Sequence, residues 1–178
     1  NKILIDDNGV RIFLDFGTSY GRRSKYYDFF VYPKSISELI NLGVVPRIDN
    51  LYSKALESIS LGGAPDFDED PEPPVDAVFI THAHMDHIGH ISLLSRKTRL
   101  YMGECTKNIL EARCETYKGS RAIDLSFDGV LESIETFHSL QRINIGHTEI
   151  IPIHVDHSIP GAYAYIIRTS EGKDIIYT

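Results

Sequence analysis

The sequence has few cysteines and no long apolar run. Its two cysteines, Cys105 and Cys114, are too few for a disulfide framework and form no CxxC metal site. We therefore expect both thiols to be reduced, as is usual in a cytoplasmic protein. The longest apolar stretches, such as 77–80 and 162–167, have the length of strands, whereas a membrane helix needs about 20 apolar residues. We expect no contact with a membrane.

Basic residues are not in excess either. The net charge is −7, from 18 basic and 25 acidic side chains. One short run supplies most of it: Asp66, Asp68, Glu69, Asp70 and Glu72. The rest of the chain is close to neutral, so no overall positive field indicates a nucleic-acid-binding protein, although bound divalent cations would add local positive charge. We expect the acidic run to be a solvated surface loop.

The size and composition are those of one ordinary globular domain. The chain has 178 residues, of which 42% are hydrophobic and 24% charged, and a domain typically has about 100–200 residues. This composition excludes a disordered chain, a collagen and a coiled coil. The sequence starts with Asn1 and has no basic-then-apolar signal segment. We expect it to be part of a longer protein.

Alternation, turn residues and caps predict a layered α/β domain with strands at both ends and helices between them. Strands are expected at 2–6, 10–16, 76–81, 99–102, 141–145, 148–155, 162–168 and 174–177. Helices are expected at 35–42, at 51–59, through Ile88, Ile91 and Leu94, and from the cap Thr106 to Tyr117. Ser35 and Glu38 have the spacing of a capping box.

The segment directly after the strand expected at 76–81 is rich in metal ligands. His82, His84, Asp86 and His87 occupy four of six consecutive positions, at the strand end where α/β sheets place their sites. Alternate residues of extended backbone point to one side, so His82 and His84 share a direction. Asp86 and His87 fall in a first helical turn and can point elsewhere. One loop can thus serve two adjacent ions. Imidazole plus carboxylate suits Zn²⁺, and less selectively Mn²⁺ or iron. The alternative is a polar loop with coincidental histidines.

This HxHxDH pattern resembles the signature of the metallo-β-lactamase superfamily. The resemblance implies an αββα fold, in which mixed β-sheets pack face to face with helices outside. It also implies two divalent metal ions, Zn²⁺ first and Mn²⁺ second. The implied ligands are His82, His84 and His157 for one ion, and Asp86 and His87 for the other. Asp15 resembles an early aspartate of the family that braces the metal loop from outside, and the alternative is a simple turn residue. Asp86 would also orient the attacking hydroxide and is the candidate catalytic residue.

Several segments are similar to the β-CASP, ribonuclease J-like branch found in bacteria and archaea. They are THAHMDHIG at 81–89, HSIP at 157–160, and LGVVP at 42–46 together with Tyr26 and Tyr27. The resemblance implies hydrolysis of RNA phosphodiester bonds in RNA processing or decay, by 5′-exonuclease or endonuclease action. It implies a cytoplasmic enzyme with single-stranded RNA as its partner, and it allows a homodimer of the intact protein.

Three further residues are candidate contacts to the substrate. Ser158 and the amides after it are placed to contact a phosphate, and a serine that starts a turn is the alternative. Arg22 and Arg23 are interleaved with tyrosines, a pattern that could contact phosphate and stack on bases, and a solvated loop is the alternative. We expect the remaining histidines not to be ligands: His90, His138, His147 and His154.

The chain stops where the family places its next metal-bridging residue. In the family a strand is followed by Gly-Asp, and the sequence ends at Thr178 just before that position. The resemblance therefore implies that 1–178 is the N-terminal part of a metallo-β-lactamase-like domain, with the rest of that domain and the inserted β-CASP domain outside this chain. We expect the chain alone to hold metal ions incompletely and to be inactive.

Three alternative functions stay open at this stage. A nuclease of another branch, such as one for transfer-RNA 3′ processing or mRNA 3′-end cleavage, would keep the chemistry and change the substrate. A small-molecule hydrolase, such as a thioesterase or lactonase, would keep the metal ions and change the bond. A non-enzymatic scaffold subunit would have lost ligands, whereas the motif ligands are all present here.

Overall fold

The computed structural model of the chain describes residues 1–27, 31–56, 66–117, 127 and 129–178. Its strands are β1 (Ile3–Asp7), β2 (Val10–Leu14), β3 (Ala77–Ile80), β4 (Leu100–Gly103), β5 (Ile134–Phe137), β6 (Ile143–Ile145), β7 (Thr148–Val155), β8 (Ala162–Arg168) and β9 (Asp174–Tyr177). Its α-helices are α1 (Tyr20–Arg23), α2 (Ile36–Asn41), α4 (Met85–Ile88) and α5 (Glu104–Tyr117), and 3₁₀ turns lie at Ile91–Leu93 and Leu131–Ser133. No helix in these ranges is long and apolar enough to cross a membrane.

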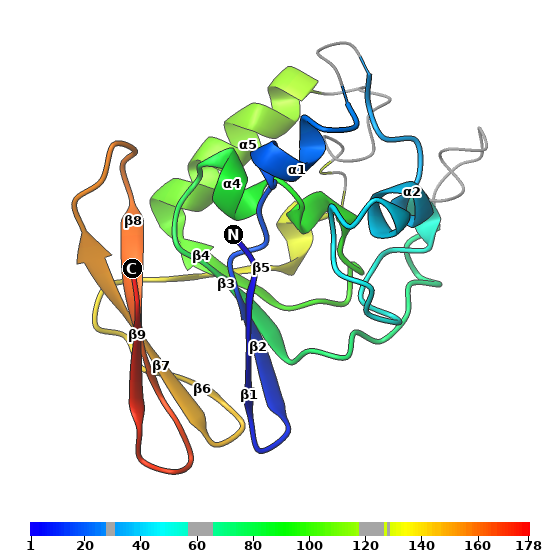
Figure 1. Cartoon of the computed structure of the whole chain (residues 1–178). Coiled ribbons are helices and arrows are strands. Elements are labelled where there is room, and N and C mark those ends of the chain that lie inside the picture. Colours follow the sequence, from blue (N-terminus) through cyan, green and yellow to red (C-terminus); the bar gives the residue numbers. More distant parts are fainter. Residues whose placement is uncertain (28–30, 57–65, 118–126, 128) are drawn as a thin grey trace.

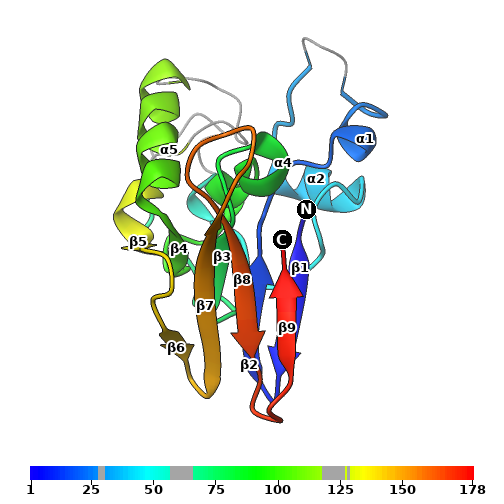
Figure 2. The ribbon, with the colours of Figure 1, turned by 90° about the vertical axis from the view of Figure 1, so that its left-hand side faces the viewer.

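The strands form two sheets that pack face to face. The first has the order β1-β2-β3-β4-β5, with an antiparallel β1–β2 hairpin and parallel pairing from β2 to β5. The second is an antiparallel meander, β6-β7-β8-β9. The helices lie on the side of the first sheet that faces away from the second (Figures 1 and 2). Among the described residues, the outer face of the second sheet carries no helix. The expected α/β class with mixed sheets and outer helices is confirmed.

The central strand β3 explains why the first sheet lies between two layers. Its sequence AVFI is apolar at every position and fully buried. Because side chains alternate along a strand, Val78 and Ile80 join the core under the helices, while Ala77 and Phe79 join the core between the sheets. An apolar run without polar alternation is therefore what a strand covered on both faces requires.

A buried carboxylate ties the first hairpin to the second sheet. Asp7 accepts hydrogen bonds from the Ser170 amide at 2.8 Å, from the Ser170 hydroxyl at 2.6 Å and from the Thr148 hydroxyl at 2.8 Å. The hydrogen bonds from Ser170, followed by that from Thr148, hold the pKa of Asp7 below its usual value. The charged form of Asp7 is therefore part of the sheet-to-sheet contact.

Two of the expected helices differ from the structure because distant backbone groups compete for their hydrogen bonds. The helix expected through Ile88, Ile91 and Leu94 is broken after α4, since the His90 amide donates to the Phe16 carbonyl at 2.9 Å instead of to its own helix. The segment expected as a helix from 51 begins as extended chain, where the Ser53 amide donates to the Leu93 carbonyl at 3.0 Å. Residues 57–59 of that prediction lie outside the described residues.

Three other predictions need correction. Thr106 does not cap α5, which begins two residues earlier; it is buried and donates to the Gly161 carbonyl at 3.1 Å. Asp70, expected in a solvated loop, is only 1% exposed and accepts hydrogen bonds from the Ser53 hydroxyl and the Arg96 amide, both at 2.8 Å. Its four acidic neighbours are exposed, as expected. The short elements α1 and β5 were not predicted.

Candidate metal centre

The centre is built where neighbouring parallel strands end. The β3 strand runs into the loop that holds Thr81, His82 and His84, and α4 begins directly after it. The β2 strand ends at the same edge of the sheet, so Asp15, which follows it, lies beside Thr81. The backbone of Asp15 is left-handed, with φ 56°, and its amide donates to the Phe79 carbonyl at 2.8 Å. This bend turns the carboxylate under the metal loop.

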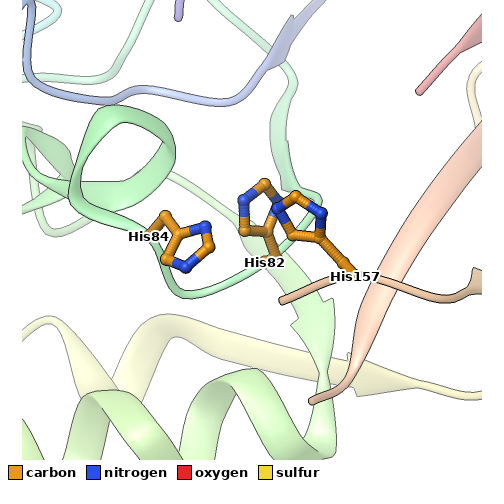
Figure 3. A group of neighbouring side chains, drawn as sticks. All are labelled: His82, His84 and His157. Atoms are coloured by element: carbon orange, nitrogen blue, oxygen red, sulfur yellow. The ribbon is translucent and has the colours of Figure 1, made fainter. Parts of the chain in front are cut away.

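Three imidazoles converge on one point. Figure 3 shows His82 and His84 from the loop after β3, and His157 from the loop after β7, turned toward one another. Each offers one ring nitrogen, and these atoms all lie within 4.8 Å of one another. His82 is buried, His84 is half-buried and His157 is exposed. The group therefore joins a ligand pair from the first sheet to a ligand from the second, and one side of it is open to solvent.

The hydrogen bonds behind the imidazoles determine which nitrogens are free. The Thr81 hydroxyl lies 3.0 Å from both oxygens of Asp15, and because a carboxylate only accepts, the hydroxyl donates to it. The Thr81 oxygen can then accept from Nδ1 of His82, 2.9 Å away. Nδ1 of His87 donates to Asp15 Oδ2 at 2.6 Å. In both rings this places the proton on Nδ1, so Nε2 is unprotonated and carries the lone pair that a metal ion binds.

The state of His82 fits a divalent cation at the three-histidine group. Nε2 of His82 is buried and has no hydrogen-bond partner among the described residues, and an orphaned polar atom of this kind needs an explanation. Burial, followed by the neighbouring His87 and His157, lowers the pKa of His82 to about 4. At neutral pH this ring is therefore uncharged and its Nε2 lone pair is unpartnered, which is the state a metal ion binds.

Asp86 and His87 form a second pair beside the three-histidine group. The His87 ring centre is 4.0 Å from that of His82. Nε2 of His87 lies 3.4 Å from Asp86 Oδ2 and 2.8 Å from the side-chain nitrogen of Asn1. A lone pair that faces a carboxylate oxygen is the arrangement that a shared cation would stabilise. The donor types of this pair therefore suit a second ion, which would take the place of the Asn1 amide at Nε2 of His87.

The segment after Asp15 clamps α4 in place. The Phe16 amide donates to the His87 carbonyl and the Thr18 amide to the Met85 carbonyl, both at 2.8 Å. At Gly17, between them, a Cβ atom would lie 1.9 Å from the Asp86 carbonyl oxygen. Only glycine allows this close approach, so the backbone position of the Asp86–His87 pair depends on it.

The metal loop opens into a cavity of about 480 Å³. Its lining includes Thr81, His82, His87, Asp156, His157 and Tyr163. The cavity has an apolar side as well, at Val155 and Ala162. A substrate atom could therefore lie next to two of the three imidazoles and to His87.

The other candidate residues lie elsewhere or are exposed. Ser158 follows His157 and is exposed. Arg22 and Arg23 lie on α1, where Arg22 donates to the Gly43 carbonyl at 2.6 Å and Arg23 lies over the Tyr32 ring at 5.9 Å. Of the three, only Ser158 is next in the chain to a member of the three-histidine group, and all three stay predictions.

Sequence reasoning missed two residues of the centre. Thr81 links Asp15 to His82, and the only signal for it is its position directly before the motif. The Tyr177 hydroxyl donates to Asp15 Oδ2 at 2.9 Å from β9, and nothing in the sequence connects the two. Asp15 therefore accepts hydrogen bonds from three different segments.

Comparisons with known proteins agree with this arrangement. Residues 62–178 match the beta-lactamase superfamily domain. Ribonuclease J of Sinorhizobium meliloti is 35% identical over 104 residues, which cover 57% of this chain and 17% of that protein. Ribonuclease J of Mycoplasma genitalium is 28% identical over 102 residues, which cover 56% of this chain and 16% of that protein. The matched region thus spans less than a fifth of these curated relatives.

Solved structures show the same fold. A protein of unknown function from Enterococcus faecalis V583 superposes with a TM-score of 0.69 and 29% identity, over 99% of this chain and 39% of that one. A metallo-β-lactamase from Cronobacter sakazakii superposes with a TM-score of 0.54 and 16% identity, over 99% of this chain and 54% of that one. The fold implies binding of divalent metal ions, and the superfamily typically contains metal-dependent hydrolases. The chain belongs to the beta-lactamase superfamily and has the metallo-β-lactamase fold.

Proposed function

We propose that the protein is a metal-dependent ribonuclease that hydrolyses phosphodiester bonds of single-stranded RNA. The observation that carries the proposal is the convergence of His82, His84 and His157, with the buried and unpartnered Nε2 of His82 among them. The similarity to ribonuclease J favours RNA over a small-molecule substrate.

The proposal assigns two divalent ions, Zn²⁺ first and Mn²⁺ second, to two groups of residues. His82, His84 and His157 would hold one ion, and Asp86 and His87 the other. When bound, these ions would supply Lewis-acid polarisation of the phosphodiester and activation of water. Imidazole and carboxylate donors suit Zn²⁺, and less selectively Mn²⁺.

The residues of the chain then have distinct tasks. Thr81 and Asp15 hold the protons of His82 and His87 on Nδ1 and keep both Nε2 atoms unprotonated. Asp86 is the proposed catalytic residue: its carboxylate, 3.4 Å from Nε2 of His87, can accept a hydrogen bond from the attacking water and orient it.

The test uses the full-length protein with end-labelled single-stranded RNA that carries either a 5′-monophosphate or a 5′-hydroxyl. Reactions contain added Zn²⁺ or Mn²⁺, and His84→Ala is compared with His138→Ala, a histidine outside the three-imidazole group. We expect metal-dependent cleavage that is lost in His84→Ala and kept in His138→Ala. Release of mononucleotides with a preference for the 5′-monophosphate would assign an exonuclease, and discrete internal products an endonuclease. Intact RNA together with stoichiometric bound metal would refute the ribonuclease proposal, and esters, thioesters and lactones would then be screened.

A further inference from the structure

A second cavity, of about 580 Å³, lies between the start of the chain, α1 and the segment after α2. Figures 1 and 2 both place these three segments close together on one side of the first sheet. The apolar part of its lining consists of Leu4, Phe13, Val44, Val45, Pro46 and Ile48. The polar part consists of Asn1, Lys2, Ser19 and Arg22. The cavity therefore combines an apolar wall with two cations, and the metal centre as described above does not use it.

The two cations are not neutralised by the protein. The Lys2 ammonium donates to the Gly17 carbonyl, and Arg22 donates to the Gly43 carbonyl at 2.6 Å. Neither has a carboxylate partner within the described ranges. An ammonium has three donors and a guanidinium five, so each retains free N–H groups. Two like charges that line one cavity without a counter-charge favour an anion between them.

Burial and charge around Lys2 agree with this interpretation. Burial, followed by the charge of Arg22, lowers the pKa of Lys2 to about 8. The ammonium is therefore still mostly protonated at neutral pH, and it lies close enough to Arg22 for the two charges to repel each other. A bound anion would relieve that repulsion.

The ligand should have an apolar part next to its anionic group. Leu4 is exposed and Pro46 and Ile48 are half-buried, so they supply a surface on which a flat ring could pack. Ser19 adds a hydroxyl. A nucleotide has this combination of an anionic phosphate and a base with two apolar faces. An inorganic anion would leave the apolar wall uncovered.

Asn1 connects this cavity to the metal centre. It lines both cavities, and its side-chain nitrogen lies 2.8 Å from Nε2 of His87. A ligand that extends past Asn1 would therefore reach from the cation pair to the candidate metal ligands. A polymer with a phosphate at each unit fits such a path, because one phosphate can lie at the cation pair while another lies at the candidate metal ligands.

We propose that this cavity binds a nucleotide of single-stranded RNA next to the cleaved bond, with its phosphate between Lys2 and Arg22 and its base on the apolar wall. This inference rests on the proposed ribonuclease function. It assigns to Lys2 a contact with the substrate. It also assigns Arg22 to one particular phosphate, rather than to general attraction of RNA by a basic surface.

The test measures binding apart from cleavage. The full-length protein in EDTA is titrated with a short fluorescent single-stranded RNA over a range of KCl concentrations. Each phosphate contact adds about 0.7 to the slope of log affinity against log salt for a single strand. We expect the double variant Arg22→Gln with Lys2→Met to lower this slope by about 0.7, because both cations contact the same phosphate, and Arg22→Gln alone to lower it by part of that amount. Lys2→Arg should keep the slope, as should Lys173→Gln in the β8–β9 turn. Arg22 is exposed, so its variant should fold even if Lys2→Met does not.

Each outcome decides between the two proposals. Unchanged slopes in Arg22→Gln and the double variant would overturn the cavity assignment, while RNA cleavage by the unmodified protein would still support the ribonuclease function. Reduced slopes without any RNA cleavage would support the cavity and refute the function. If free adenosine monophosphate displaces the fluorescent RNA at the same concentration as unlabelled RNA does, the cavity is a mononucleotide site and the proposed path for the RNA is wrong. No RNA binding at low salt would overturn it as well.

Discussion

Replacing Asp15 with asparagine should weaken both the fold and the metal centre. Asp15 is fully buried, and its Oδ2 accepts hydrogen bonds from Nδ1 of His87 at 2.6 Å and from the Tyr177 hydroxyl at 2.9 Å. Asparagine keeps the shape of the side chain and tolerates the left-handed backbone at this position. The substitution therefore removes the charge. It also puts an NH₂ group or an uncharged oxygen in the place of the carboxylate oxygen that accepts the hydrogen bonds of His87 and Tyr177.

The magnitude follows from these contacts. A hydrogen bond to a charged group contributes about 1.5–3 kcal/mol, and a neutral one about 0.5–1.5 kcal/mol. With two such bonds weakened, we expect the free energy of unfolding to fall by about 2–3 kcal/mol. If the new NH₂ group donates to Nδ1 of His87, the ring proton moves to Nε2, which can then no longer bind a metal ion. Loss of a partner of this kind typically costs about 10–100-fold in metal affinity.

Two measurements on the full-length protein test this reasoning. Urea unfolding of the metal-free protein gives the free energy of unfolding, and calorimetric titration with Zn²⁺ at neutral pH gives the affinity. Asp49→Asn, at an exposed aspartate, removes the same charge without touching the network and should match the unmodified protein in both. If Asp15→Asn unfolds at the same urea concentration and binds Zn²⁺ with the same affinity, the hydrogen-bond account of the centre is wrong.

Three further substitutions test other parts of the structure. Gly17→Ala would place a Cβ atom 1.9 Å from the Asp86 carbonyl oxygen. It should lower the free energy of unfolding by about 1–3 kcal/mol and weaken Zn²⁺ binding. The control Gly21→Ala has open space around its Cβ position and should do neither. Asp7→Asn should lower the melting temperature at pH 6 but much less at pH 3. The pKa of Asp7 is lowered in the folded protein, so its charge stabilises the fold above the normal carboxyl pKa, and this stabilisation is lost as the pH falls through the folded pKa. An equal loss at both pH values would contradict this. Tyr177→Phe should cost about 1.5–3 kcal/mol in urea unfolding by removing a hydrogen bond to a buried carboxylate, and a variant as stable as the unmodified protein would show that this bond contributes nothing.

The parts of the fold that were predicted correctly depend on local patterns. The strands β7, β8 and β9 have the predicted bounds because strong β-formers are bounded by turn residues such as Gly146 and Gly172, both of which have positive φ. The position of the four motif ligands directly after β3 also follows from one short segment. The Ser35 cap was identified in the same way, and its hydroxyl accepts from the Glu38 amide at 3.1 Å.

The parts that were missed depend on contacts between distant segments. His90 interrupts its helix because Phe16, far away in the sequence, offers a carbonyl. Asp70 is buried because Ser53 and Arg96 surround its carboxylate. The hydrogen bond of Tyr177 to Asp15 and the cavity at Lys2 likewise arise only when the chain has folded. Local propensity carries no information about such pairs.

The three imidazoles lie on loops that follow strands of two different sheets, so a metal ion bound there would affect the lifetime of the protein. An ion held by His82, His84 and His157 would be a cross-link between the layers of the sandwich, closed only in the folded chain. At a free ion concentration about a hundred times the dissociation constant, such a link adds about 2.7 kcal/mol to the free energy of unfolding. Depletion of the ion would then open the sandwich to proteases, so that the abundance of the protein in a cell would follow the supply of its metal.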